Sequence, residues 1–96
     1  MSVVEITTFR LADGADDDGF LALDRRVQTE LVPNQPGFMR RTTTRRGDDW
    51  LVVTLWATEA DAVAFEDVAN RDPAQTEFDG HLEVGSVITR RFDTLD

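Results

Sequence analysis

The sequence predicts an α+β fold in which a four-stranded antiparallel sheet carries two helices on one face. Strand-like and helix-like segments follow one another in the order β-α-β-β-α-β, as the period of their apolar residues indicates. The two middle strands are joined by a tight turn, which predicts a hairpin. No linker, repeat or low-complexity stretch interrupts residues 1–96, so we expect a single domain. Two split βαβ units with right-handed crossovers give the ferredoxin-like sandwich.

The first strand and the first helix occupy the N-terminal third of the chain. Residues 3–11 (VVEITTFRL) are β-branched, aromatic and roughly alternating, which predicts a strand. Three aspartates at 16–18 favour a helix start, where carboxylates interact with the positive end of the helix dipole. Prolines 33 and 36 then end the helix near Val32. Its apolar stripe consists of Phe20, Leu23, Val27 and Leu31.

The middle of the chain predicts a hairpin formed by residues 38–46 (FMRRTTTRR) and 50–56 (WLVVTLW), with the turn at 47–49. In the expected fold the first and third strands are central and the second strand lies at an edge. We expect a second helix capped by Thr58, with Asp61 in the capping-box position. Its predicted stripe is Ala64, Phe65, Val68 and Ala69.

The C-terminal part is predicted to hold one more strand. The second helix ends between 70 and 73, and residues 74–81 are expected to form a short extra turn containing Phe78. Residues 83–92 alternate and predict the last strand.

The third strand is apolar on both faces, which predicts that the protein is a homodimer. Leu51, Val53 and Leu55 share one face of this strand. Two helices cover only one face of the sheet, and the other would expose an apolar patch of roughly several hundred Å². A second copy packed sheet against sheet with two-fold symmetry would cover it. We expect Trp50 to lie in this contact; the alternative is a monomer whose C-terminal segment folds over the open face.

Composition excludes several classes of protein. The chain has 41% hydrophobic and 30% charged residues, as globular domains do, and a net charge of −9, which disfavours nucleic acid and anionic membranes as partners. The longest apolar run, 51–53, is far too short to span a bilayer. No signal peptide is recognised, so we expect a cytoplasmic protein. The absence of Cys excludes thiol chemistry, and residues 16–18 lack calcium-loop spacing, so no metal site is expected.

Several of these segments together resemble a known family. The features are an acidic first helix, Pro36-Gly37-Phe38 before the second strand, the Trp-terminated strand LVVTLW, and a second helix that opens with TEADA. From Val3 to Phe92 the chain resembles the antibiotic biosynthesis monooxygenase (ABM)-like domains of the dimeric α/β-barrel superfamily. The resemblance implies a homodimer with a small-molecule cavity between the sheet and the helices of each protomer. Family members include cofactor-free monooxygenases, haem-degrading enzymes, isomerases and proteins without known activity, so fold alone decides no function.

The haem-degrading branch of this family is disfavoured by three positions. That branch uses an Asn on the first strand and a Trp and a His on the second helix. The Asn position carries Thr7 here, and the Trp position carries Phe65. The only histidine, His81, comes several residues too late.

Trp56, His81 and Arg90 are the candidate catalytic residues. Trp56 could form a stacking wall that also donates its indole N–H, or could be a packing residue of the core. His81 could be a proton shuttle at the cavity mouth, because imidazoles titrate near neutrality, or an exposed loop residue. Arg90 shares a face with Ile88 and could point into the cavity or pair with a surface acid.

The candidate substrate-binding residues are Thr7, Phe9, Phe65 and Asn70. Glu5 shares a face of the first strand with Thr7 and Phe9, and it is a candidate acid or base if it is buried. The alternative is that Glu5 forms a salt bridge to a neighbouring Arg. The run RRTTTRR over 40–46 could hold an anionic ligand. Alternation along the strand splits these arginines between the two faces of the sheet. The favoured interpretation is therefore that their charges keep this edge strand from pairing with another chain and that they pair with nearby acids.

Two functions therefore remain open. The first is cofactor-free oxygenation of a small anthrone- or quinol-like aromatic, in which a substrate carbanion reduces oxygen directly. The alternative is a non-catalytic small-molecule-binding or stress-associated protein that holds an apolar or aromatic ligand in the same cavity. A cavity lined only by apolar groups would favour binding, whereas a buried polar group within reach of a ligand would favour the enzyme.

Overall fold

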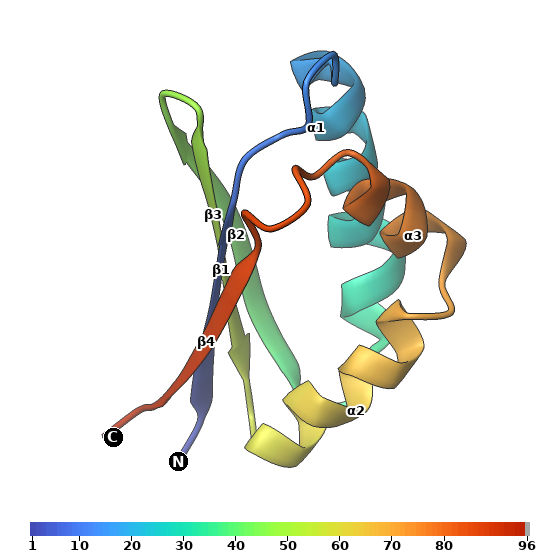
Figure 1. Cartoon of the computed structure of the whole chain (residues 1–96). Helices are drawn as coiled ribbons and strands as arrows, with labels where there is room; N and C mark the ends of the chain where they lie inside the picture. The colour runs from blue at the N-terminus through green and yellow to red at the C-terminus, as the bar shows by residue number, and fades with distance from the viewer. Residues whose placement is uncertain (96) are drawn as a thin grey trace.

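The computed structural model describes residues 1–95 and contains the predicted sheet. Strands β1 (Val3–Phe9), β2 (Phe38–Arg46), β3 (Asp49–Trp56) and β4 (Ile88–Asp93) are antiparallel and lie in the order β2-β3-β1-β4 (Figure 1). The first and third strands are therefore central and β2 lies at an edge, as predicted. This arrangement confirms the α+β ferredoxin-like fold.

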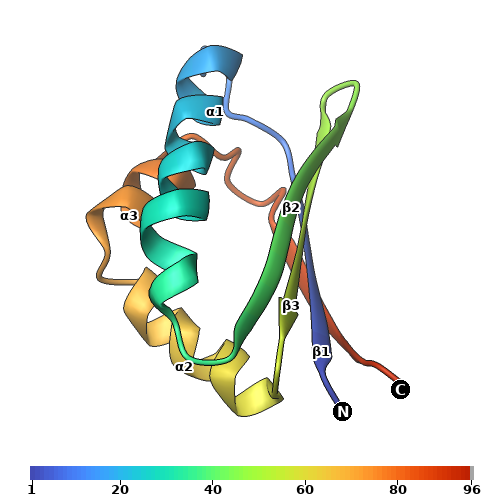
Figure 2. The same cartoon turned by 180° about the vertical axis from the view of Figure 1, so that it is seen from behind.

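All three helices lie on one face of the sheet, as the two opposite views in Figures 1 and 2 show. They are α1 (Asp17–Arg26), α2 (Glu59–Ala69) and α3 (Pro73–Gly80). A π-helical turn over Val27–Leu31 and a 3₁₀ turn over Val32–Asn34 extend α1. The third helix is longer than the short turn that the sequence predicted. Asp72 caps it and Pro73 occupies its first turn, where proline is preorganised for a helix.

Side-chain caps confirm the predicted starts of the first two helices. Asp16 accepts a hydrogen bond from the Gly19 amide at 3.1 Å. Thr58 accepts one from the Asp61 amide at 3.1 Å and donates its hydroxyl proton to the Asp61 carboxylate at 2.8 Å. Asp61 thus supports the cap through the Thr58 hydroxyl.

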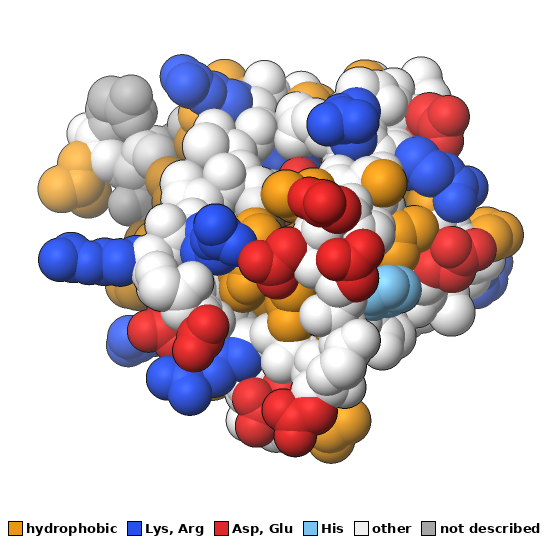
Figure 3. All heavy atoms as spheres, turned by 90° about the horizontal axis from the view of Figure 1, so that it is seen from above, with side chains coloured by type: hydrophobic (Ala, Val, Ile, Leu, Met, Phe, Trp, Pro, Cys, Tyr) orange, Lys and Arg blue, Asp and Glu red, His pale blue; other side chains and the backbone are white. Residues whose placement is uncertain are grey.

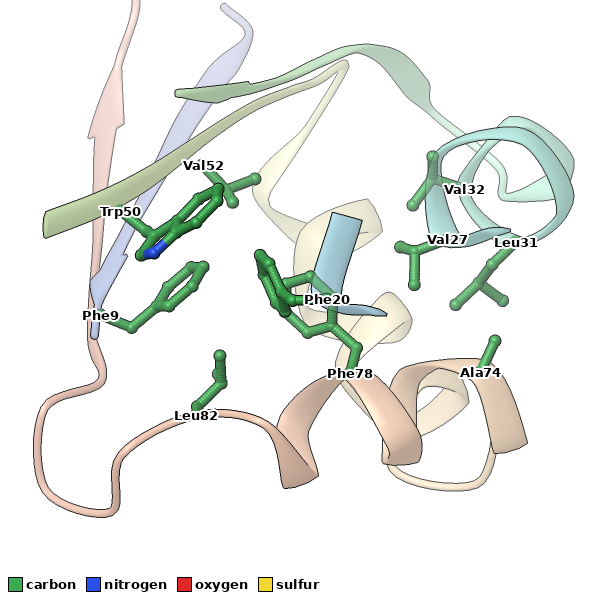
Figure 4. Packing of buried hydrophobic residues seen from close by; sticks show 10 residues of the cluster. All are labelled: Phe9, Phe20, Val27, Leu31, Val32, Trp50, Val52, Ala74, Phe78 and Leu82. Atoms are coloured by element: carbon green, nitrogen blue, oxygen red, sulfur yellow. The ribbon is translucent and has the colours of Figure 1, made fainter. Parts of the chain in front are cut away.

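Aromatic side chains form the core at the hairpin end of the molecule (Figure 4). The rings of Phe9 and Trp50 stack with centroids 6.4 Å apart, and Phe20 meets Trp50 edge-on at 4.9 Å. Phe78 of α3 lies 4.8 Å from Phe20. Trp50 is only 4% exposed, so the prediction that it lies on the open face is wrong. Residues 50 and 56 share a face by the period of the strand, and this face is the one the helices cover.

Trp56 lies in a second aromatic cluster at the other end of the sheet. Its indole is fully buried between Phe38 and Phe65, whose ring centroids lie 5.8 and 5.2 Å away. The buried residue of α2 is Ala62, and Phe65 is half-buried beside it, whereas Ala64 is exposed. The predicted apolar stripe of this helix is therefore wrong at Ala64, because the docked face begins at Ala62.

The last strand begins later than predicted. Gly85 has a φ of +88°, which favours glycine, and the Ser86 amide donates to the Glu83 carbonyl at 3.1 Å. These features form a turn over residues 83–86, and regular pairing with β1 starts where Thr8 faces Ile88.

The outer face of the sheet is uncovered by any described part of the chain. Its apolar residues include Val4, Val53, Leu55 and Phe92, and half of Phe92 is exposed. The Thr94 amide donates to the Ser2 carbonyl at 2.9 Å, so residues 93–95 run beside β1 and do not fold over this face. This excludes, for residues up to 95, the predicted alternative of a covered monomer.

No helix within residues 1–95 combines the length and the apolar character needed to cross a membrane.

Candidate functional site

A cavity of about 190 Å³ lies between the sheet and the helices. Its apolar wall includes the side chains of Phe9, Val52, Phe65 and Phe78. Its polar groups come from all layers of the fold, and they include Glu5, Thr7, Thr54, Gln75, Asp79 and Thr89. Aromatic walls with a few converging polar groups are typical of small-molecule sites.

Asp79 is an acid in the wall of this cavity, and its pKa is raised. It follows Phe78 on α3, and its outer side is exposed to solvent. Partial burial of its carboxyl raises the pKa, while a hydrogen bond donated by Gln75 Nε2 at 2.9 Å acts in the opposite direction. The net raised pKa makes the ionised form a stronger base than an ordinary aspartate.

Glu5 is held by an arginine, as one of the two predictions for it stated. Arg91 of β4 faces Glu5 of β1 in the register, and its Nε donates to Glu5 Oε2 at 2.8 Å. The same guanidinium donates to Glu66 of α2. Burial by itself lowers the pKa of Arg91, but hydrogen bonds and charge attraction from Glu66 and Glu5 raise it overall. This network links the sheet to α2 at one side of the cavity.

Thr7 and Thr89 place two hydroxyl groups in the cavity. They face each other across β1 and β4, and their Oγ1 atoms lie 3.1 Å apart. Each hydroxyl can donate or accept, so this pair can adapt to either kind of ligand group.

Arg41 also lines the cavity, and its guanidinium is held in a buried network. Its Nη2 is 2.8 Å from Asp24 Oδ1, and its Nη1 donates to Gln28 Oε1 at 3.2 Å. The guanidinium carbon lies 5.7 Å from the centroid of the Phe78 ring. The favoured interpretation of the arginine run, pairing with acids, holds here and for Arg45, which pairs with Asp17 at 2.7 Å.

A second hollow of about 210 Å³ adjoins the cavity and shares Glu5, Phe65, Gln75 and Thr89 with it. Asn70, at the end of α2, lines this second hollow. The four residues predicted to bind substrate are thus brought together along the two hollows, Phe65 lining both. Their role in binding stays a prediction.

The three predicted catalytic residues do not line either hollow. Trp56 is fully buried in its own aromatic cluster, and its Nε1 finds no hydrogen-bond partner within residues 1–95. His81 ends α3, where its Nδ1 lies 2.9 Å from the Glu77 carbonyl, and its ring reaches the surface in Figure 3. Arg90 faces Ile6 on the open side of the sheet, so of the two possibilities left for it, the one that it points into the cavity is wrong. Arg91 takes the inward position because alternate residues of a strand face opposite sides.

Sequence reasoning missed Asp79, Gln75 and Arg41. The first two lie on α3, which the sequence analysis treated only as a short turn. Their spacing of four residues would have placed them on one helix face, and Pro73 after Asp72 was the available signal for that helix. Arg41 was seen only as a member of the charged run.

Within residues 1–95, no group of three or more His, Asp or Glu side chains is arranged to hold a metal ion.

Comparison with solved structures shows which proteins share this fold. The oxygenase SnoaB of Streptomyces nogalater, a cofactor-independent enzyme, is 17% identical with a TM-score of 0.74, covering 99% of this chain and 94% of that chain. A provisionally assigned antibiotic biosynthesis monooxygenase from Bordetella bronchiseptica is 14% identical with a TM-score of 0.80, covering 98% and 97% of the two chains. A dimeric ferredoxin-like protein of unknown function from Jannaschia sp. CCS1 is 9% identical with a TM-score of 0.72, covering 98% and 100%.

These likenesses confirm the resemblance noted in the sequence at the level of the fold. The chain has the ferredoxin-like fold of ABM-like domains over essentially its whole length. No family model matches the sequence, and no curated protein does either.

Proposed function

We propose that this protein is a cofactor-free monooxygenase of a small hydroxyaromatic substrate bound between the sheet and the helices. The observation that carries the proposal is one cavity that combines aromatic walls with a carboxyl of raised pKa, that of Asp79. A buried polar group within reach of a ligand favours the enzyme over a passive binder, and Thr54 and Arg41 of this cavity are buried. The cofactor-independent oxygenase SnoaB, which shares the fold, adds support.

The size of the cavity limits which aromatic molecules could be its substrate. Small-molecule sites typically enclose roughly 300–1,000 Å³, and this cavity encloses about 190 Å³. A quinol-like molecule with one or two rings suits it best. A three-ring anthrone-like substrate would need the adjoining hollow of about 210 Å³ as well, in contact with Asn70.

The proposed chemistry uses Asp79 as the base. Its carboxylate takes a proton from the substrate, and the resulting anion transfers an electron to O₂. Recombination of the two radicals forms a carbon–oxygen bond, and Asp79 returns its proton to the resulting peroxide anion. The peroxide then loses water, whose second hydrogen comes from the oxygenated carbon, and a carbonyl is left. One oxygen atom enters the oxidised product and the other leaves as water, so the substrate supplies all the electrons. The hydroxyls of Thr7 and Thr89 are placed to orient a phenolic oxygen.

Oxygen uptake tests the proposal. Purified protein is assayed on a panel of quinols and anthrones with no metal or flavin added. General base catalysis typically contributes about 10²- to 10⁴-fold, so Asp79→Asn is expected to lower the rate by at least about 100-fold. Glu77→Gln is the matched control, because it alters an exposed carboxyl on the same helix that lines neither hollow.

Two further variants test the earlier candidates. Under this proposal Trp56→Phe and His81→Ala keep oxygen uptake, since neither side chain lines the cavity. Equal oxygen uptake by the Asp79→Asn and wild-type proteins would contradict the assignment of Asp79 as the base. A loss of oxygen uptake in His81→Ala alone would make His81 the candidate catalytic residue again.

The alternative function is binding of an aromatic metabolite without turnover, as in a carrier or stress-associated protein. It is favoured if the same quinols bind saturably while oxygen uptake stays at the rate without protein. In that case Asp79→Asn should alter affinity by no more than about tenfold, the value of one or two hydrogen bonds.

We also propose that two copies pack through the open face of the sheet. The apolar residues Val4, Val53 and Leu55 surround a shallow hollow on this face, and no described part of the chain covers it. The dimeric neighbour from Jannaschia supports this assembly. The closing contact would bring Arg40, Arg46 and Arg90 of each copy near those of the other, and each chain carries a net charge of −9. Dimerisation should therefore strengthen as salt screens this repulsion.

Sedimentation at micromolar concentration tests the assembly. Val53→Glu, on the open face, is expected to give a monomer. Val63→Glu is the matched control, because Val63 is 47% exposed on α2, which lies on the helix side of the sheet. A wild-type monomer, or equal dissociation by both variants, would contradict the open-face dimer.

A further inference from the structure

Gln75 is a polar side chain of the cavity to which the proposed reaction gives no role. It lies on α3 one helical turn before Asp79, and it lines both hollows of the site. Its Nε2 donates a hydrogen bond to Asp79 Oδ1 at 2.9 Å. Gln75 therefore contacts the proposed base directly, and it can act on the reaction through that base.

The sequence of α3 fixes where Gln75 and Asp79 lie. The Asp72 carboxylate caps the helix and accepts a hydrogen bond from the Gln75 amide at 3.1 Å, so the first turn is held at Gln75 itself. Phe78 is 5% exposed, and its ring centroid lies 4.8 Å from that of Phe20 (Figure 4). Asp79 directly follows this buried anchor, and Gln75 lies four residues earlier on the same helix face. The cap and the anchor thus place the two side chains together in the wall of the cavity.

Gln75 is the hydrogen-bond donor that Asp79 has within residues 1–95. Asp79 takes part in none of the ion pairs in this part of the chain. His81, which ends the same helix, lies against the Glu77 carbonyl instead. The charged side chains of the elements around α3 form ion pairs of their own, which are Glu5 and Glu66 with Arg91, Arg41 with Asp24, and Arg26 with Glu30 and Glu77.

A neutral amide is well suited to holding a base. The N–H of Gln75 stabilises the carboxylate by a hydrogen bond but adds no positive charge, which would make Asp79 a much weaker base. No group within residues 1–95 donates to Asp79 Oδ2, so this oxygen is left to accept a proton from a substrate. A carboxylate that is held through one oxygen rotates less, and proton transfer depends on such orientation.

We propose that Gln75 is a positioning residue, which holds Asp79 by Oδ1 so that Oδ2 meets the acidic proton of the bound aromatic. This role rests on the proposed function, because Asp79 acts as a base only in that reaction. Gln75 keeps its own protons throughout.

Carbon-13 NMR of the Asp79 carboxyl over a series of pH values tests the contact without any substrate. Gln75→Met keeps the length of the side chain and removes the donor, so the pKa of Asp79 should rise above that of the wild-type protein. Gln75→Glu should also raise this pKa, since a second carboxylate repels the first, and it replaces the Met variant if that variant does not fold. Gln35→Met is the matched control, because the Nε2 of Gln35 donates to the Leu31 carbonyl at 3.1 Å and the residue lines neither hollow.

Oxygen uptake on the panel of quinols over the same pH range tests the effect on the reaction. Gln75→Met should lower kcat about tenfold, the value of one hydrogen bond, and change KM by less than about twofold. The acidic limb of its rate profile should move to higher pH, as the pKa of Asp79 does in NMR, because Asp79 must be ionised to act as a base. Gln35→Met should leave kcat and the pH profile unchanged.

Three results would overturn the inference. An unchanged pKa of Asp79 in both Gln75 variants would show that Gln75 does not hold the carboxyl. A raised KM with unchanged kcat in Gln75→Met would make Gln75 a substrate contact and not a positioning residue. Absence of oxygen uptake by the wild-type protein would refute the proposed function, and Gln75 would then have no base to position, even where NMR confirms its contact with Asp79.

Discussion

The buried ion pair between Asp24 of α1 and Arg41 of β2 should be a major determinant of stability. The two side chains are only 14% and 5% exposed, and their nearest N and O atoms lie 2.8 Å apart. Asp24 also accepts a hydrogen bond from Thr43 at 2.8 Å. Asp24→Ala leaves the buried charge of Arg41, in the wall of the cavity, with Gln28 as its remaining acceptor.

The structure allows the size of this effect to be worked out. Removing one partner of a buried ion pair typically costs about 3–5 kcal/mol, because the other charge stays buried without compensation. Since Gln28 still accepts from Arg41, we expect the lower end, about 3 kcal/mol. For a domain of this size each kcal/mol corresponds to about 4–8 °C, so Tm should fall by about 12–24 °C.

Urea unfolding at one fixed protein concentration measures the loss. Asp17→Ala is the matched control, because it removes an aspartate of the same helix whose pair with Arg45 is 46% and 57% exposed. We expect that control to cost less than about 1 kcal/mol. Asp24→Ala combined with Arg41→Met should recover part of the loss, since no unpaired charge then remains.

Two results would refute this reasoning. Asp24→Ala could prove no more costly than Asp17→Ala, which would mean that solvent reaches Arg41. The double variant could also lose as much as the two single variants together, which would mean that the two charges do not interact.

Three more predictions follow from individual residues. Burial raises the pKa of Asp79 above its unfolded value of about 3.8, so the folded state binds the proton more tightly than the unfolded state does. The free energy of unfolding should therefore fall as pH rises from about 3.8 through the raised pKa of the folded state. Urea unfolding at a series of pH values measures this slope, which Asp79→Asn should remove. A Cβ on Gly37, which has a φ of +77°, would lie 2.0 Å from the Asp61 carboxylate, so Gly37→Ala should lower the free energy of unfolding by more than about 3 kcal/mol. Gly47→Ala is the control, because Gly47 has a φ of +61° but open space around it, and it should cost about 1 kcal/mol. Equal losses of Tm in the two variants would contradict this prediction. Trp56→Phe should lower the free energy of unfolding by about 2 kcal/mol, since the indole is fully buried. The same variant should leave KM for aromatic substrates unchanged. A raised KM with unchanged stability would instead place Trp56 in the substrate site.

Local patterns were sufficient to predict most elements of the fold. The second strand was predicted at residues 38–46 and is found there, and the third was predicted within one residue. Thr58 was recognised as a cap because its hydroxyl acts on an amide three residues away. Such features depend on neighbours in the chain, and the sequence shows those directly.

The functional residues were harder to predict because the cavity is made by elements far apart in the chain. Thr7 and Phe65 were found through the family resemblance. Asp79 and Gln75 were missed because α3 is short, with only Ala74 and Phe78 buried, and a single helical turn of apolar residues gives little periodic signal. Their relevance follows from the packing of α3 against α1, which brings Phe78 onto Phe9 of β1.

The amino-acid sequence by itself determined the order of the four strands and the first two helices, the caps of those helices and the apolar character of both sheet faces. Only the tertiary structure decided which arginine of the last strand faces the cavity. The turn at Gly85 sets where β4 begins, and the pairing of Arg91 with Glu5 then sends Arg90 to the open face. Because side chains alternate with a period of two, a shift of one residue exchanges the two faces, and no local pattern fixes that register.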